Sequence, residues 1–270
     1  MNSFIGQKRI IKELLAIQGN LLENKNLGIN LLLRGPGGCG KTHLAKGFSR
    51  KFGPYTIQWP MKGFRWDKKC EDERAHIVDE VHLLKTPEEM FRYMDEEKYI
   101  FILTTTEGGS LVEPLTSRCI QFNFEPYNLT DLATIIMNHS KIKNFPIIID
   151  TAILIAERSK GSPRIAKQYL DRMGFMINQE YHPFTIPGIK AAFDEVGIFD
   201  GGYTELDIRY LKILSQQGTA SLHTLASAIR VDKATITNDI EPFLISKNHI
   251  SITSKGRKFL SWRAEDYDKR

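Results

Sequence analysis

Hydrophobic residues in the first part of the chain alternate between short continuous runs and helical spacing. The runs are Ile29–Leu33, Ala75–Val78 and Tyr99–Leu103, and strands that are apolar at nearly every position are typical of the interior of a parallel sheet. Helical spacing predicts one helix over Ile10–Leu22 and another over about Leu44–Phe52. This alternation predicts an α/β fold.

Beyond this part the pattern becomes helical. Asn128 and Asp150 are suited to cap two helices. Ser162 followed by Pro163 predicts the start of a third, because proline is favoured at the first helical position. The predicted helices cover residues 129–138, 150–161, from 163 onward, and 187–196. A small helical domain is therefore expected here.

The last part of the chain follows a linker at Gly201-Gly202. Its pattern predicts three helices and then a strand, a turn and a strand, which is the order of a winged helix-turn-helix. The helices are predicted over 205–217, 221–229 and 233–244, and the strands over 250–252 and 259–260. We therefore predict three domains, over residues 1–126, 127–200 and 203–263.

Composition changes this picture little. The 37 Lys and Arg against 32 Asp and Glu, with pI near 9.0, only weakly favour a polyanionic partner. Cys39, Cys70 and Cys119 lack paired C-x-x-C spacing, which argues against a zinc site or disulfides and favours a reducing, cytoplasmic setting. No segment approaches the roughly 18 apolar residues of a membrane span, so no membrane association is expected.

A complete phosphate-binding loop joins the first predicted strand to the helix after it. Backbone N–H groups of its glycines can approach phosphates, Lys41 can neutralise their β and γ oxygens, and the Thr42 hydroxyl can ligate magnesium. This predicts a site for ATP and Mg²⁺. The loop residues are Gly35, Pro36, Gly37, Gly38, Cys39, Gly40, Lys41 and Thr42.

Polar residues end the two following strands. Asp79 can hold the magnesium shell, and Glu80 can orient and deprotonate the attacking water. A hydroxyl of Thr104, Thr105 or Thr106 could hold that water or touch the γ-phosphate. Because β-branched residues also simply favour strands, both interpretations of the threonines stay open.

Two arginines complete the set. Arg118 lies in Ser117-Arg118-Cys119, and Arg164 in Gly161-Ser162-Pro163-Arg164. With the preceding motifs, this order resembles the AAA+ ATPases. The resemblance implies that Arg118 is a finger reaching a neighbouring subunit's nucleotide, whereas Arg164, with Pro163, senses the nucleotide of its own subunit. A finger in trans contributes roughly a thousandfold or more to hydrolysis, so a homo-oligomer, expected to be a hexameric ring, is needed.

More narrowly, the chain is similar to the RuvB family of Holliday-junction motors over nearly its full length. The family resemblance implies an ATPase domain with a helical lid and a C-terminal winged helix that contacts DNA phosphate. It places Phe4 and Ile5 at the adenine, and we expect His43 beside them. The matching segments are Phe4-Ile5-Gly6-Gln7, Asp79-Glu80-Val81-His82, Gly161-Ser162-Pro163-Arg164-Ile165-Ala166, Glu241-Pro242-Phe243-Leu244-Ile245 and Lys255-Gly256-Arg257.

The predicted wing is basic. No acidic residue lies between Pro242 and Ala264, which suits phosphate neutralisation. Lys255, Arg257 and Lys258 are the expected DNA contacts, although a merely solvated basic face is the alternative.

The chain departs from the family in two ways. Between Asp79 and Thr104 there is no room for the long hairpin that docks RuvA, and the Ser117-Arg118-Cys119 box resembles that of sliding-clamp loaders. Two functions therefore stay open. One is a ring-forming DNA motor of the helicase or branch-migration type, in recombination, repair or replication; the other is a loader that places a replicative helicase or clamp on DNA.

The segment Trp59–Lys69 interleaves aromatic and basic residues. Such segments can bind single strands, or their tryptophans can pack on the sheet. Packing is the favoured interpretation.

Overall fold

The computed structural model describes residues 4–60, 63–176 and 184–262. The chain forms two compact units. The first contains the described residues up to Lys143 together with Gly161–Gln168, and the second contains Asn144–Lys160 and the described residues from Tyr169 onward. The predicted division into three domains stays a prediction. In the described part, no helix is long and apolar enough to cross a membrane.

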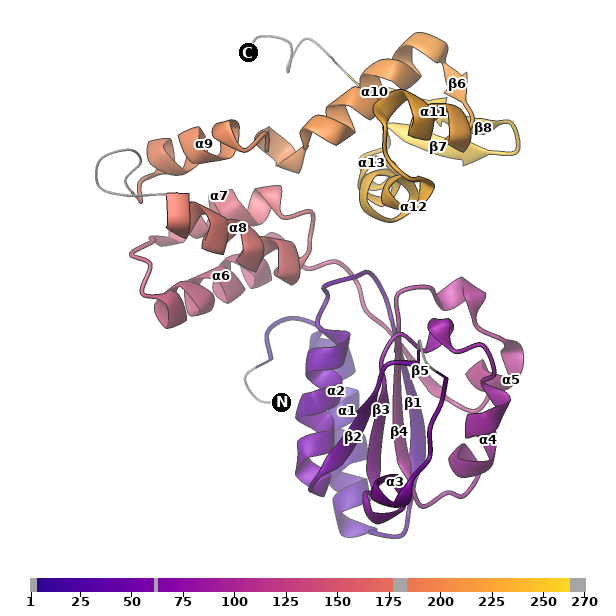
Figure 1. Cartoon of the computed structure of the whole chain (residues 1–270). Coiled ribbons are helices and arrows are strands. Elements are labelled where there is room, and N and C mark those ends of the chain that lie inside the picture. The colour runs from indigo at the N-terminus through magenta and orange to yellow at the C-terminus, as the bar shows by residue number, and fades with distance from the viewer. Residues whose placement is uncertain (1–3, 61–62, 177–183, 263–270) are drawn as a thin grey trace. The chain divides into compact units, whose positions relative to one another are not determined.

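The first unit is built on a parallel sheet with the strand order β2-β3-β4-β1-β5 (Figure 1). The parallel sheet and the apolar strands predicted for it are confirmed. The edge strand β2 is an addition, because its sequence has no continuous apolar run. The strands are β1 Ile29–Arg34, β2 Tyr55–Gln58, β3 Ala75–Val78, β4 Ile100–Thr105 and β5 Ile120–Asn123.

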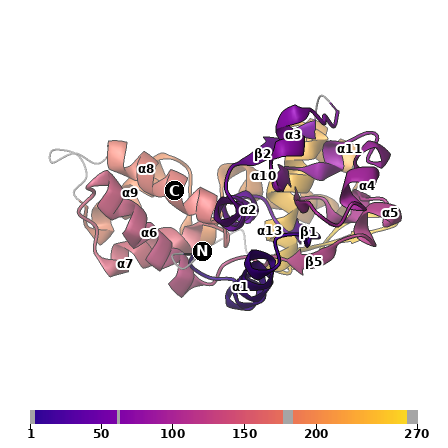
Figure 2. The ribbon, with the colours of Figure 1, turned by 90° about the horizontal axis from the view of Figure 1, so that it is seen from below.

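Helices cover both faces of this sheet (Figures 1 and 2), with α1 and α2 on one side and α4 and α5 on the other. Successive strand residues serve opposite faces. Leu31 and Leu33 pack with Leu44 of α2, whereas Leu32 packs with Met90 of α4, which is why three consecutive residues of the strand are apolar. The helices are α1 Lys8–Glu23, α2 Lys41–Ser49, α3 Lys68–Asp72, α4 Glu88–Met94, α5 Glu113–Thr116 and α6 Leu129–Lys143.

Two connecting segments of the first unit, residues 95–99 and the aromatic segment 59–69, bear on the sequence predictions. Only residues 95–99 join α4 to β4, so the predicted lack of a long hairpin is confirmed. In the aromatic segment, Trp66 stacks on Tyr93 with ring centroids 3.9 Å apart and Phe64 is buried, as the packing interpretation predicts. Trp59 differs, because 59% of it is exposed. Met61 and Lys62 lie outside the described residues.

The second unit begins with the rest of the helical region. Asn128, in the first unit, does cap α6, since its side chain accepts from the N–H of Asp131. The cap predicted at Asp150 is wrong: α7 has Ile148 as its N-cap and stops at Arg158, because Ser159 already leaves helical geometry. The helices are α7 Ile149–Arg158, α8 Pro163–Met176, which begins in the first unit, and α9 Ile186–Glu195.

The C-terminal part is a winged helix, as predicted. A capping box between Thr204 and Asp207 starts α10, and a single π-helical turn over Ile236–Ile240 separates α12 from α13. The elements are α10 Glu205–Gln217, β6 Thr219–Ala220, α11 Leu222–Ile229, α12 Lys233–Thr235, α13 Glu241–Ser246, β7 Ile250–Thr253 and β8 Gly256–Phe259, with sheet order β6-β8-β7.

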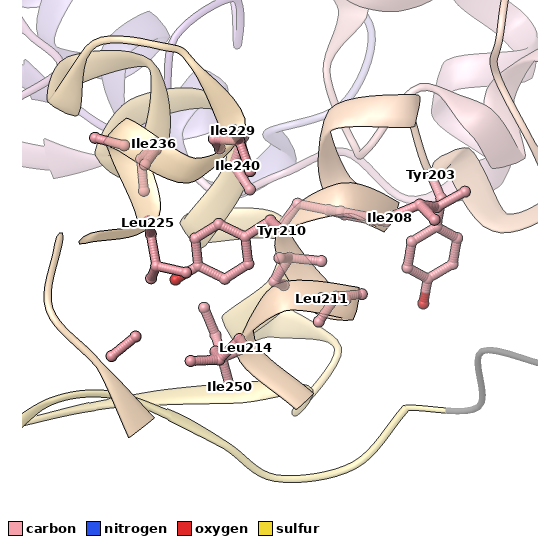
Figure 3. Packing of buried hydrophobic residues seen from close by; sticks show 14 residues of the cluster. Tyr203, Ile208, Tyr210, Leu211, Leu214, Leu225, Ile229, Ile236, Ile240 and Ile250 are labelled. Carbon is pink, nitrogen blue, oxygen red and sulfur yellow. The ribbon is translucent and has the colours of Figure 1, made fainter. Parts of the chain in front are cut away.

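A polar network crosses the core of this domain. Figure 3 shows Tyr210 among the buried aliphatic side chains, including Leu225 and Leu214. The Tyr210 hydroxyl donates to Glu241 Oε1 at 3.0 Å, and burial raises the pKa of this phenol. Arg257 donates from Nε to the same oxygen at 2.7 Å and from Nη2 to Oε2 at 3.2 Å. The side chain of Glu241 is only 2% exposed, so Arg257 compensates a buried charge.

Arg257→Ala leaves the Glu241 carboxylate buried without its counter-charge. Because such a loss typically costs about 3 kcal/mol or more, we expect the free energy of unfolding of the second unit to fall by roughly that amount in chemical denaturation. Lys258→Ala, at the next and exposed position of β8, is the control and should change it by less than about 0.5 kcal/mol. Equal losses in the two variants would contradict the role of the pair.

Candidate active site

The phosphate-binding loop lies between β1 and α2, and its glycines are required by close approach. A Cβ on Gly38 would lie 2.6 Å from Ser162 Oγ, and one on Gly35 would lie 2.5 Å from the carbonyl oxygen of Phe124. Gly35, Gly38 and Gly40 also have positive φ angles of 143°, 79° and 90°, which favour glycine. The loop can therefore turn tightly enough to direct backbone N–H groups at an anion.

Lys41 closes this loop on itself. Its ammonium donates to the carbonyl oxygens of Gly35 at 2.7 Å and Pro36 at 2.9 Å. Burial lowers the pKa of Lys41, while the nearby carboxylates of Glu80 and Asp79 act in the opposite direction. The side chain is thus held at the centre of the loop.

The Asp79 carboxylate accepts hydrogen bonds from three side chains. Its Oδ1 accepts from the Thr42 hydroxyl at 2.7 Å and from the Thr104 hydroxyl at 2.5 Å. Its Oδ2 accepts from the indole N–H of Trp59 at 3.2 Å. Sequence reasoning had included Thr104 among the candidate threonines but had not assigned Trp59 to the site.

The oxygens of Thr42 and Asp79 suit a magnesium ion, which prefers hard oxygen ligands and binds through one or two carboxylates together with substrate phosphates. The hydrogen bond from Thr104 fixes the orientation of the Asp79 carboxylate. Among the described residues there is no cluster of three or more His, Cys, Asp or Glu side chains that could hold a metal by themselves, so this pair is the candidate ligand set.

Glu80 follows Asp79 in a left-handed conformation, with φ of 54°. Its Oε2 accepts from both the backbone N–H and the hydroxyl of Thr106, each at 3.0 Å, and His82 Nδ1 lies 3.4 Å away. The carboxylate also lines the cavity described below. It is therefore placed to contact a water molecule bound there.

The other two candidate threonines, Thr105 and Thr106, differ in their surroundings. Thr106 contacts Glu80 directly. Thr105 is fully buried, and its hydroxyl bonds to His82 Nδ1 at 3.0 Å and accepts from the N–H of Glu107 at 3.0 Å. Thr105 thus shapes the turn after β4, whereas Thr106 contacts the Glu80 carboxylate.

These motifs surround a cavity of ≈ 490 Å³ within the first unit. Arg164 and Pro163 line it from the start of α8, and the ring of Phe4 lies 5.9 Å from that of His43. Burial lowers the pKa of His43 and raises that of the loop thiol Cys39. The lining residues are Phe4, Ile5, Gly38, Gly40, Lys41, Thr42, His43, Glu80, Tyr127, Ile135, Asn138, His139, Ile142, Pro163, Arg164 and Lys167.

Sequence reasoning missed the wall that α6 contributes to the cavity. Ile135, Asn138, His139 and Ile142 all line it, and their spacing places them on one face of a helix. That periodicity was the available signal. Tyr127 was also missed; its ring lies where a Cβ on Gly6 would clash, at 2.5 Å, so it packs against the N-terminal segment.

Arg118 does not line this cavity. Its Nε and Nη2 donate to the two carboxylate oxygens of Asp95 at 2.9 and 3.2 Å, and its Nη1 donates to the Pro114 carbonyl at 2.8 Å. The guanidinium is partly exposed.

The candidate DNA contacts of the wing differ from one another. Lys255 and Lys258 are exposed. The guanidinium of Arg257 is paired with Glu241 inside the domain and only 15% of the side chain is exposed, so its expected contact with DNA stays a prediction. Arg263 in the same basic run lies outside the described residues.

Comparison with protein families gives two matches. The RuvB AAA lid domain matches residues 127–181, and the RuvB C-terminal winged helix domain matches residues 200–262.

Individual relatives match over nearly the full chain. The proteins of Campylobacter hominis and Wolinella succinogenes, each named Holliday junction branch migration complex subunit RuvB, are 28% identical to it; the alignments cover 95% of the chain and 85% and 86% of those proteins. The solved structure of the Thermotoga maritima RuvB Holliday junction branch migration motor is similar with a TM-score of 0.84 and 27% identity, covering 97% of the chain and 94% of that structure.

The contact between Trp59 and Asp79 offers an optical test of the site. A divalent cation that engages the Asp79 carboxylate competes with the indole N–H, so Mg²⁺ with a non-hydrolysable ATP analogue should change tryptophan emission. Trp59→Phe, which leaves Trp66 and Trp262 in place, should abolish that change while nucleotide affinity stays within about threefold, since a single exposed hydrogen bond contributes little. An unaltered emission change in Trp59→Phe would refute this assignment.

Proposed function

We propose that the chain, which is similar to the RuvB AAA+ ATPases and has only a short connection between α4 and β4, is an ATP-driven DNA motor of the branch-migration type that acts in recombination or repair. The observation that carries the proposal is the convergence of the phosphate-binding loop, Glu80 and Arg164 on one cavity, with Asp79 bonded to Thr42 of its lining, in a chain whose likeness to RuvB proteins continues through the winged helix.

The motif residues in and beside the cavity have proposed parts in ATP hydrolysis. Lys41 and the loop N–H groups bind the phosphates, Glu80 orients and deprotonates the attacking water, and Thr106 orients Glu80. Arg164 contacts the nucleotide from the lid. Phe4 and Ile5 border the adenine, next to His43.

Magnesium is proposed to bind between Thr42 and Asp79. The ion would neutralise phosphate charge when bound. The protein's own contribution is to fix the carboxylate, which Thr104 holds through a 2.5 Å hydrogen bond.

Arg118 is proposed to act in trans, which makes the active form a homo-oligomer, expected to be a hexameric ring. Its absence from the lining of its own cavity supports this role. A subunit by itself would bind ATP but hydrolyse it slowly.

DNA is proposed to contact the wing through Lys255 and Lys258. Both are exposed and flank Arg257, which is committed to Glu241. Contacts of this kind neutralise phosphates without reading sequence.

A loader is the second candidate function. The five-residue connection between α4 and β4 leaves no hairpin to dock RuvA, so the ATPase could instead place a replicative helicase or clamp on DNA. Duplex translocation driven by ATP would favour the motor, and its absence together with ATP-dependent capture of a ring protein would favour the loader.

The ring model predicts separate effects on binding and hydrolysis. Arg118→Ala should leave ATP affinity within about twofold and lower kcat roughly 1000-fold, because the finger touches only the neighbour's nucleotide. Lys41→Ala, the comparison variant, should lose ATP binding itself. Isothermal titration and steady-state ATPase assays measure both, and full turnover by Arg118→Ala at low protein concentration would exclude the ring model.

The wing assignment predicts a change in salt dependence. The double variant Lys255→Ala with Lys258→Ala should weaken duplex binding uniformly across sequences and reduce the slope of log K against log salt by about two, one for each lost phosphate contact. Lys8→Ala with Lys12→Ala removes the same charge from the exposed side of α1 and serves as the control. A slope that stays the same in the wing variant speaks against phosphate contacts there.

A further inference from the structure

The guanidinium of Arg118 is held by an unusually complete set of contacts for a partly exposed side chain. Asp95 binds it through two parallel hydrogen bonds of 2.9 and 3.2 Å, and the carbonyl of Pro114 accepts a third. The ring of Phe91 lies beneath it, 4.5 Å from the guanidinium carbon to the ring centroid. Planar, stacked and bidentate contacts of this kind fix the orientation of an arginine, which a lysine could not reproduce.

The residues beneath Arg118 come from a firmly anchored element. Phe91 lies on α4, and Asp95 is the C-cap residue of that helix, with its N–H bonded to the Phe91 carbonyl at 2.9 Å. Met90 and Met94 of the same helix are buried against the sheet. The position of the Asp95 carboxylate is therefore set by the core of the unit.

Stability alone does not account for this arrangement. Side-chain exposure is 32% for Arg118 and 53% for Asp95, and exposed ion pairs contribute little to folding. The contacts occupy three of the five guanidinium N–H groups. Each terminal nitrogen keeps one N–H group that has no hydrogen-bond partner within residues 4–60, 63–176 and 184–262.

We propose that Asp95 and Phe91 are positioning residues that present Arg118 to the nucleotide of a neighbouring subunit. Two oriented N–H groups at the outer edge of the guanidinium suit the oxygens of a phosphate, while Asp95 and Phe91 remain behind it. This inference rests on the proposed trans role of Arg118. It explains how the Arg118 guanidinium is placed accurately enough for that role, since a misplacement of about 1 Å can lower the rate a hundredfold.

The test is Asp95→Asn, which keeps the shape of the side chain but replaces one of the two accepting oxygens with an NH2 donor, so that the two parallel hydrogen bonds from Arg118 cannot both form. We expect kcat for ATP to fall about 10- to 100-fold, with nucleotide affinity and melting temperature unchanged. Glu96→Gln is the matched control, because Glu96 lies on the same connection and pairs with Lys98 instead. It should retain full turnover.

A double variant separates positioning from general damage. If Asp95 acts through Arg118, adding Asp95→Asn to Arg118→Ala should cause no further loss of kcat. An additional loss, or a loss of nucleotide affinity, would overturn the inference and indicate a structural role. Unchanged turnover in Asp95→Asn would reduce the pair to a surface contact, and raised turnover would mean that Asp95 restrains the finger.

The same data distinguish this inference from the proposed function. Full turnover in Arg118→Ala would refute the trans role itself. An inactive Arg118→Ala beside a fully active Asp95→Asn would leave the trans role intact and refute only the positioning by Asp95.

Discussion

Parallel pairing of β1, β3 and β4 in one register is the constraint on which the site depends. Because the carboxyl ends of parallel strands meet at the same edge, the loop after β1, the acidic pair after β3 and the threonines ending β4 converge there. The register aligns Leu33 with Thr104 and Val78 with Leu103. A slip of one residue would turn Thr104 to the opposite face of the sheet and remove its 2.5 Å contact with Asp79.

Much of this could be predicted because the signals are local. Buried strands are largely apolar runs, and the motifs around the cavity are short segments with fixed spacing. The order of predicted helices and strands along the chain then indicates the α/β unit and the winged helix. The edge strand β2 escaped prediction because Tyr55–Gln58 mixes polar and apolar residues and is buried only in part. The wall formed by α6 was overlooked because its cavity-lining residues resemble an ordinary amphipathic face.

The rest could not be predicted because it depends on pairs that are distant in sequence. Trp59 reaches Asp79 across 20 residues, Arg118 reaches Asp95 across 23, and Arg257 reaches Glu241 across 16. The basic wing illustrates the difficulty. A run of positive residues indicates phosphate binding. However, a single buried carboxylate on another element can form an ion pair with one of those residues, and only the fold shows which residue is paired.

The hydrogen bonds of Lys41 bear on how fast a nucleotide can bind to the phosphate-binding loop. Two of its three ammonium N–H groups hold the loop's own carbonyl oxygens, and the third can face an incoming phosphate. Because these two hydrogen bonds already hold the loop in shape, the ligand does not have to order it. Nucleotide association can then proceed without a preceding step that orders the loop. The entropy cost of ordering the loop arises when the chain folds.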